Sequence, residues 1–264
     1  MKIPHVTSAD GTRIAFESAG KGPPLILVGG AFCDRKARAS GTPLAALLAP
    51  HFTVFSYDRR GRGDSADTPD WAIEREVEDL AALIREAGGS AFEYGISSGA
   101  LLGLTAAVRQ LAIPKLALYE PPLLLDASRA KQFDDLAEQL QGHAAAGRRS
   151  EAAELFLTRV VQVPAPAVAQ MKQAPLWRGL ESLAHTLSYD VRITALGPAL
   201  LDRAPLVRAA TLALCGTACP PWMHDAIRAL SEAIPAGSQR VLEGQTHDVD
   251  PQVLTGALLE FFSA

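Results

Sequence analysis

The stretch Gly95–Gly99, which reads Gly-Ile-Ser-Ser-Gly, is the most informative part of this 264-residue chain. It follows the strand-like run Ala91–Tyr94, and an apolar helical pattern begins directly after it. Gly-x-Ser-x-Gly between a strand and a helix is typical of a tight turn whose small flanking residues avoid the neighbouring strands. Such a turn places its central serine, here Ser97, beside the positive end of a helix dipole. The same pattern also occurs in turns that bind nothing, so the rest of the chain must be weighed with it.

Continuous apolar runs recur along the chain, and such runs are typical of strands that are buried on both faces of a parallel sheet. Turn residues around Gly11 predict a hairpin over residues 4–18. Spacings of three and four between apolar residues predict helices in several of the intervals between the runs. Strands that alternate with helices indicate an α/β fold with a doubly wound, mostly parallel sheet of about eight strands. The predicted strands are Pro24–Val28, Phe52–Tyr57, Ala91–Ile96, Lys115–Tyr119, Thr211–Cys215 and Gln239–Leu242, and the predicted helices include Trp71–Ala87, Trp222–Ile234 and Val253–Phe262.

Residues 123–205 interrupt this alternation. They show helical patterns without a clear buried strand, and several glycines and prolines divide them into short helices. We interpret this segment as a helical cap inserted over the carboxyl edge of the sheet, where ligands bind in open α/β folds. Residues 1–122 and 206–264 would then form the core. The plainer interpretation, further helices on the flank of the sheet, stays open.

Composition limits the classes of partner and site. Hydrophobic residues make up 48% of the chain and the net charge is −4, which is typical of a soluble globular protein and disfavours nucleic acid or an anionic membrane as partner. We expect a cytoplasmic protein that acts on a small molecule, and a homodimer stays open. Three cysteines argue against a disulfide framework. The Cys215-x-x-x-Cys219 pair has neither a second pair nor a cluster of histidines near it, so we expect no metal and no cofactor.

Four features, taken in chain order, resemble the α/β-hydrolase family. The resemblance covers essentially the whole chain outside the expected cap. The segment Tyr57–Ser65, which reads YDRRGRGDS, is the most specific to the family, although its role there is structural more than catalytic. We expect Asp58 and the arginines of this segment to form a local network of ion pairs and capping contacts. The four features are Leu25–Gly30 with Ala31 after it, Tyr57–Ser65, the turn at Ser97, and Gly244–His247.

The resemblance implies a role for individual residues. Ser97 would be the nucleophile, and His247, in a loop after the last strand, would be the base that takes its proton. The backbone N–H groups of Ala31 and Ser98 would form the oxyanion hole. The chain departs from the common His-Gly pattern at the end of the first parallel strand, because Gly29 stands where the family has histidine.

The acid that would orient His247 is less clear. The family usually carries an aspartate after the strand that follows the cap, but this chain has Gly216–Pro221 there, without a carboxylate. Some members carry the acid at the end of the strand that follows the serine and its helix, and by that resemblance Glu120 is the first candidate. Asp225 and Asp248 stay open. Glu120 also has a purely structural interpretation, as a strand-end carboxylate that caps the following segment.

The resemblance therefore implies a serine hydrolase that needs no cofactor. Its substrate would be a small to medium, partly apolar ester, thioester or lactone. Two other hypotheses keep the fold and change the function. The first is a carbon–carbon lyase or cyclase, which the missing aspartate and the missing histidine would suit. The second is a ligand-binding protein in which the serine turn is a relic. Active esters would acylate Ser97 only in the hydrolase.

Overall fold

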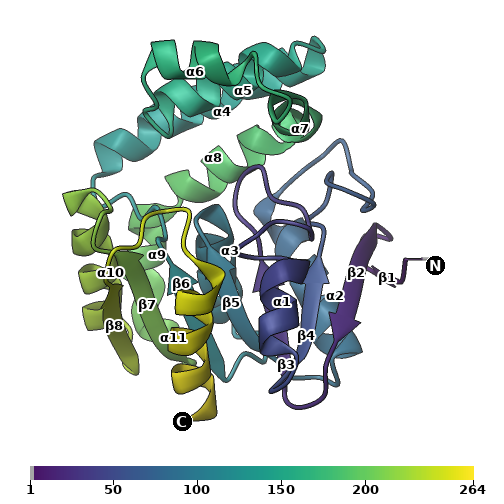
Figure 1. The fold of residues 1–264 in the computed structure, drawn as a ribbon, viewed down its shortest axis with the longest axis vertical. Helices are drawn as coiled ribbons and strands as arrows, with labels where there is room; N and C mark the ends of the chain where they lie inside the picture. The colour runs from purple at the N-terminus through teal and green to yellow at the C-terminus, as the bar shows by residue number, and fades with distance from the viewer. Residues whose placement is uncertain (1–2) are drawn as a thin grey trace.

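The computed structural model describes residues 3–264 and has one eight-stranded sheet in the order β1-β2-β4-β3-β5-β6-β7-β8 (Figure 1). The first two strands form the predicted antiparallel hairpin, and β2 pairs antiparallel with β4. All other pairs are parallel, which confirms the predicted sheet. The strands are β1 (His5–Thr7), β2 (Arg13–Ala19), β3 (Pro24–Val28), β4 (Thr53–Tyr57), β5 (Phe92–Ile96), β6 (Lys115–Tyr119), β7 (Ala210–Gly216) and β8 (Gly237–Leu242).

Helices cover both faces of the sheet, as the unbroken apolar strands require. On β3, Ile26 and Val28 pack on one face, while Leu25 and Leu27 pack on the other. The first face is covered by α2 (Ile73–Glu86), α3 (Ser98–Val108) and α10 (Pro221–Ala233), and the second by α1 (Thr42–Leu48) and α11 (Pro251–Ser263). No helix within residues 3–264 is long and apolar enough to cross a membrane.

The regular secondary structure of residues 123–206 consists of helices and short 3₁₀ turns. In Figure 1 the first four of these helices form a layer above the sheet. The segment has a hydrophobic cluster separate from those of the sheet, in which Leu140, Phe156 and Leu187 are buried. The helix α8 lies between the layer and the sheet and contacts both α4 and α3. The helices of this segment are α4 (Ala127–Ala145), α5 (Arg149–Arg159), α6 (Ala165–Met171), α7 (Trp177–Leu183), α8 (Leu187–Ala195) and α9 (Gly197–Arg203), with short 3₁₀ turns at Ala184–Thr186 and Ala204–Leu206.

Candidate active site

The turn between β5 and α3 holds Ser97 in a backbone conformation that residues other than glycine rarely adopt, with φ 58° and ψ −131°. Its surroundings admit only small residues. A Cβ atom on Gly95 would lie 2.7 Å from the Cα of Ala100, and one on Gly30 would lie 2.7 Å from the Cβ of Ser97. A Cβ on Gly99 would collide with backbone carbonyls at the end of β3. The half-buried Ser97 side chain therefore sits on a rigid turn at the carboxyl end of β5.

The second part of the site is a contact between Glu120 and His247. Glu120 directly follows β6, is buried, and has a φ of 44°. Its Oε2 lies 2.7 Å from Nδ1 of His247, and its Oε1 accepts a hydrogen bond of 3.1 Å from the backbone N–H of Gly216. Both carboxylate oxygens are thus held in place. Because a carboxylate accepts hydrogen bonds, the contact favours the tautomer of His247 that carries its proton on Nδ1.

His247 stands in the loop between β8 and α11, and its side chain is 57% exposed. The neighbouring loop backbone is tied to the sheet, because the hydroxyl of Tyr119 donates a hydrogen bond of 2.6 Å to the carbonyl of Thr246. The sheet thereby fixes the backbone next to an otherwise exposed histidine.

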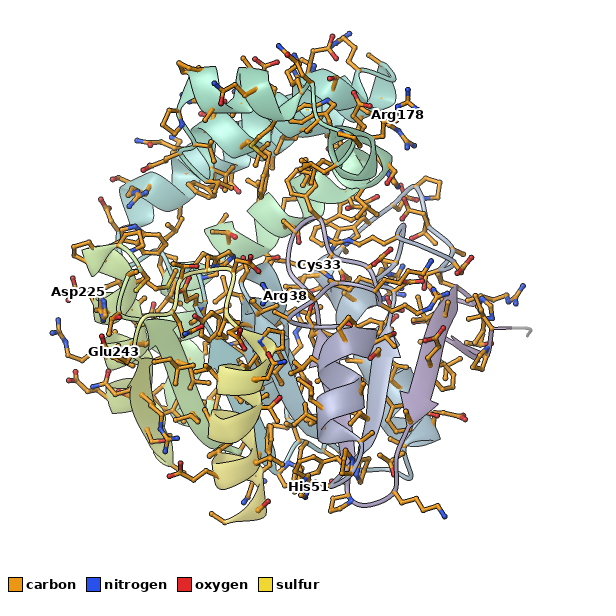
Figure 2. All side chains as sticks on the ribbon, in the orientation of Figure 1. Cys33, Arg38, His51, Arg178, Asp225 and Glu243 are labelled. Atoms are coloured by element: carbon orange, nitrogen blue, oxygen red, sulfur yellow. The ribbon has the colours of Figure 1, made fainter. Side chains whose placement is uncertain are left out.

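The other two carboxylates that the sequence left open have different partners. Asp248 is 78% exposed, with Oδ2 3.4 Å from Nη1 of Arg38. Asp225 forms an exposed ion pair of 2.6 Å with Arg228 and lies at the outer edge of the molecule in Figure 2. Of the three candidates, Glu120 is the one whose contact with His247 is present in the structure.

The loop after β3 is held by two buried arginines of the YDRRGRGDS segment. Arg62 donates to the carbonyl of Gly30 at 2.5 Å, and Arg59 donates to the carbonyl of Gly29 at 3.2 Å. In a trans peptide the C=O of Gly30 and the N–H of Ala31 share one plane and point in opposite directions. The hydrogen bond from Arg62 to the carbonyl of Gly30 therefore also orients the N–H of Ala31. This contact braces the loop in which Gly29 replaces the family's histidine.

Both arginines converge on Asp190, which α8 contributes from the helical segment. Asp190 is buried and accepts hydrogen bonds from Arg59 at 2.8 Å, from Arg62 at 2.8 and 2.9 Å, and from the Ser98 hydroxyl at 2.7 Å. Burial alone would raise the pKa of Asp190, but the charges of Arg62 and Arg59 hold it below its usual value. Sequence reasoning missed Asp190. Its signal was a carboxylate on the buried face of a helix, between Leu187 and Thr194.

The remaining residues of the segment make the expected network of ion pairs. Buried Asp58 accepts backbone hydrogen bonds from Arg35 at 2.8 Å and Asp64 at 2.9 Å, and it pairs with the guanidinium of Arg35. Arg60 makes a two-pronged pair with Asp79 at 2.7 and 2.8 Å. The prediction of such a network is confirmed. Arg35 is an addition from outside the segment. Arg59 pairs with helix carboxylates, and Arg60 pairs with Asp79 of α2 and with Asp10 of the first hairpin rather than with Asp58.

Apolar groups adjoin the loop after β3. Phe32, with a φ of 57°, packs edge-to-face on Phe156 of α5 with ring centroids 5.3 Å apart. Ala31 and Phe32 are partly exposed and pack on the hydrophobic cluster of the helical segment. By contrast, three open surface depressions lie away from Ser97 and His247, one of them on α7 around Trp177. The Phe32–Phe156 contact thus places apolar surface next to the loop after β3.

Comparison with known proteins identifies the family to which this fold belongs. A model of the alpha/beta hydrolase family matches residues 25–255. An alpha/beta hydrolase from Sphaerobacter thermophilus DSM 20745 is 46% identical, covers 98% of this chain and 100% of its own, and superposes with a TM-score of 0.88. A thermophilic esterase from Thermogutta terrifontis is 24% identical over 100% of this chain and 98% of its own, with a TM-score of 0.74, and shows the fold alone. An uncharacterized hydrolase of Bacillus subtilis (strain 168), YraK, is 28% identical over 152 residues, which span 55% of this chain and only 54% of that relative. The chain therefore belongs to the alpha/beta hydrolase family.

Proposed function

We propose that this protein is a serine hydrolase that cleaves ester, thioester or lactone bonds in small to medium, partly apolar substrates. The observation that carries the proposal is the contact of 2.7 Å between Glu120 and Nδ1 of His247, in a chain that also presents Ser97 on a strained turn. A histidine with its Nδ1 proton held by a buried carboxylate has Nε2 available as a base.

The proposed reaction has two halves. Ser97 Oγ attacks the substrate carbonyl while Nε2 of His247 takes the hydroxyl proton, and Glu120 stabilises the resulting imidazolium. The imidazolium then gives this proton to the leaving alcohol or thiol, and an acyl-enzyme remains on Ser97. Water attacks the acyl-enzyme with His247 again as base, which releases the acid and restores the serine.

Negative charge on the reacting oxygen would be stabilised by the N–H groups of Ala31 and Ser98. The Ser98 N–H belongs to the first turn of α3, whose dipole favours negative charge at this end. The Ala31 N–H is oriented through the hydrogen bond from Arg62 to the carbonyl of Gly30. The catalytic value of such donors comes from being fixed before the reaction, and both peptide groups are anchored by buried residues.

The apolar part of the substrate would lie against Phe32, next to the oxyanion loop. This position favours acyl groups of modest size, because the ring of Phe156 already packs against Phe32. The rival hypothesis of a lyase or cyclase drew on the missing aspartate and on the missing histidine of the loop after β3. The contact of Glu120 with His247 supports the hydrolase against the first of these grounds. The hydrogen bonds from Arg62 and Arg59 to that loop support it against the second.

Reaction with a fluorophosphonate probe tests the proposal most directly. We expect one adduct per chain by intact mass, mapped to the peptide that contains Ser97, and hydrolysis of short-chain p-nitrophenyl esters by the unlabelled protein. Ser97→Ala should lose both, whereas Ser263→Ala, at an exposed position near the end of α11, should keep both. An unlabelled yet folded wild-type protein, or an adduct on another residue, would refute the serine mechanism.

A further inference from the structure

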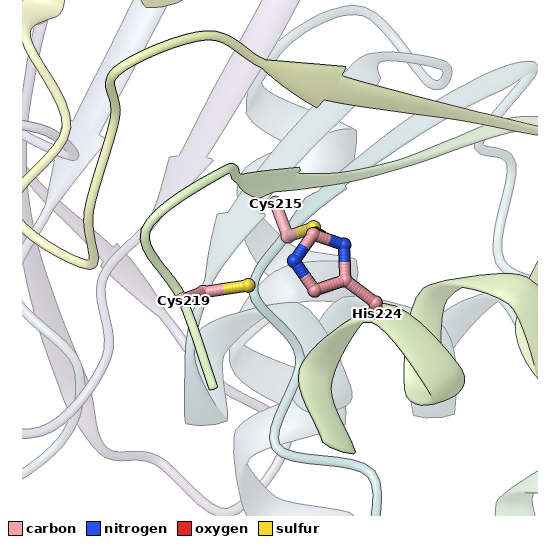
Figure 3. Close-up of side chains that lie close together, drawn as sticks. All are labelled: Cys215, Cys219 and His224. Atoms are coloured by element: carbon pink, nitrogen blue, oxygen red, sulfur yellow. Dashed lines mark hydrogen bonds between the residues drawn. The ribbon is translucent and has the colours of Figure 1, made fainter. Parts of the chain in front are cut away.

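A second cluster of reactive side chains lies at the end of β7, outside the candidate active site. It comprises Cys215 in β7, Cys219 in the following loop, and His224 in α10 (Figure 3). The Sγ of Cys215 lies 3.4 Å from Nδ1 of His224, and the three donor atoms all lie within 4.8 Å of one another. The expectation of no metal rested on the lack of a second cysteine pair and of a histidine cluster near Cys215 and Cys219, and it did not weigh the single His224, which α10 places beside Cys215.

The distances suit a tetrahedral metal centre. Bonds of about 2.3 Å from zinc to sulfur and about 2.0–2.1 Å from zinc to nitrogen place a sulfur and a nitrogen ligand about 3.6 Å apart, and two sulfur ligands about 3.8 Å apart. The separation of 3.4 Å between Cys215 Sγ and His224 Nδ1 is close to the first of these values. The other two donor separations are at most 4.8 Å, so the three atoms lie near the spacing that ligands of one ion require.

The chemistry of the donors selects the ion. Thiolates and an imidazole favour zinc and other soft or borderline cations over magnesium or calcium, which prefer oxygen ligands. Cys215 and Cys219 are buried, whereas His224 is partly exposed on α10 and offers a route from solvent.

We propose that Cys215, Cys219 and His224 form a binding site for one zinc-class cation. Binding converts both thiols to thiolates and releases their two protons to solvent, so that the bound divalent ion and the two sulfurs are together neutral. Three protein ligands leave one of four positions to water. This site does not depend on the proposed hydrolase activity, since Ser97 and His247 take no part in it.

Titration of the reduced, chelator-treated protein with Co²⁺ tests the site through a readout other than activity. We expect one equivalent to bind, with thiolate-to-cobalt charge-transfer absorption and the visible bands of tetrahedral Co²⁺, and Zn²⁺ to displace it. Cys219→Ser should weaken the charge-transfer band. Loss of an outer-shell partner weakens metal binding by about 10- to 100-fold, and loss of a direct ligand should weaken it further.

Matched variants separate this site from the candidate active site. Cys33→Ser, the third cysteine, and His247→Ala should both retain the cobalt spectrum. His224→Ala should lose affinity, and because His224 is partly exposed this variant should fold, as circular dichroism will check, even if the buried Cys215→Ser variant does not. The proposal is overturned by a cobalt complex without charge-transfer absorption, by no binding at all, or by binding that His247→Ala removes and Cys219→Ser keeps.

Discussion

At the scale of single residues, the orientation of His247 depends on the charge of Glu120. In Glu120→Gln the amide oxygen can still accept from the backbone N–H of Gly216, but the amide nitrogen then faces Nδ1 of His247 as a donor. The histidine must then carry its proton on Nε2, the nitrogen that should receive the proton of Ser97. We therefore expect kcat for ester hydrolysis to fall by about 10⁴-fold, as in a comparable loss of the triad carboxylate. Steady-state kinetics together with a thermal melt will separate this effect from loss of folding.

The two exposed carboxylates that the sequence left open supply the control for that experiment. Asp248→Asn removes only a solvated contact with Arg38, and pairs of this kind contribute about 0–1 kcal/mol. We expect its kcat to stay close to that of the wild type, and the same of Asp225→Asn. A loss of activity in Asp248→Asn with a fully active Glu120→Gln would move the role of the acid to Asp248.

At the scale of elements, β5 and α3 enclose the carboxyl group of Glu93. Glu93 on β5 is buried, and within residues 3–264 neither of its carboxylate oxygens has a hydrogen-bond partner. A Cβ atom on Gly103 of α3 would collide with it, so the helix packs directly against the carboxyl group. Desolvation raises the pKa of Glu93 from 4.5 to about 8. The folded protein therefore keeps Glu93 protonated at neutral pH.

This packing makes stability depend on pH. Below pH 4.5 Glu93 is protonated in both the folded and the unfolded chain, so the protein keeps the full free energy of unfolding that depends on this proton. Between about pH 5 and 8 the unfolded chain ionises first, and stability falls with rising pH by up to about 1.4 kcal/mol per unit. We expect Glu93→Gln to remove this dependence of the free energy of unfolding on pH, as measured by urea unfolding at a series of pH values. Glu86→Gln, at an exposed position on α2, should keep it. Parallel stability curves for the wild type and Glu93→Gln would contradict the assignment.

Local patterns predicted the elements that are repetitive in sequence, and they failed where partners are distant in the chain. The buried strands and the amphipathic helix α2 follow from periodicity, and the family motif located the turn at Ser97. The helix α1, with only 7 residues, has too few turns for a clear period and was not predicted. The Glu120–His247 contact joins residues 127 positions apart, and the sequence could only rank Glu120 against other carboxylates. Asp190 gains partners that lie 92 to 131 positions away only when α8 docks on the sheet. His224 is only 9 positions from Cys215, and it was missed because a single histidine gives no cluster in the sequence.

At the scale of the whole molecule, Asp190 ties the helical segment to the sheet. Within residues 3–264, Asp190 is the one carboxylate that pairs with Arg62, whose other contacts are the carbonyls of Gly30 and Cys33. Arg59 also pairs with Glu76, at 2.6 and 2.7 Å. The contacts between α3 and α8 therefore close over a buried charge cluster rather than over apolar side chains alone. The same cluster holds the backbone of the proposed oxyanion loop.

Asp190→Asn keeps the shape of this side chain and removes its charge, which leaves the guanidinium of Arg62 buried without a carboxylate. Breaking a buried pair in this way costs about 3–5 kcal/mol, a large part of the about 5–15 kcal/mol that stabilises a typical domain. We expect urea unfolding to show that loss, and kcat to fall in the folded protein because the carbonyl of Gly30 is held less firmly. Asp202→Asn, at an exposed position on α9, should change neither quantity. If Asp190→Asn unfolded like the wild type, the helical segment would be held to the sheet by its apolar contacts, and the arginines of the YDRRGRGDS segment would orient the loop without help from α8.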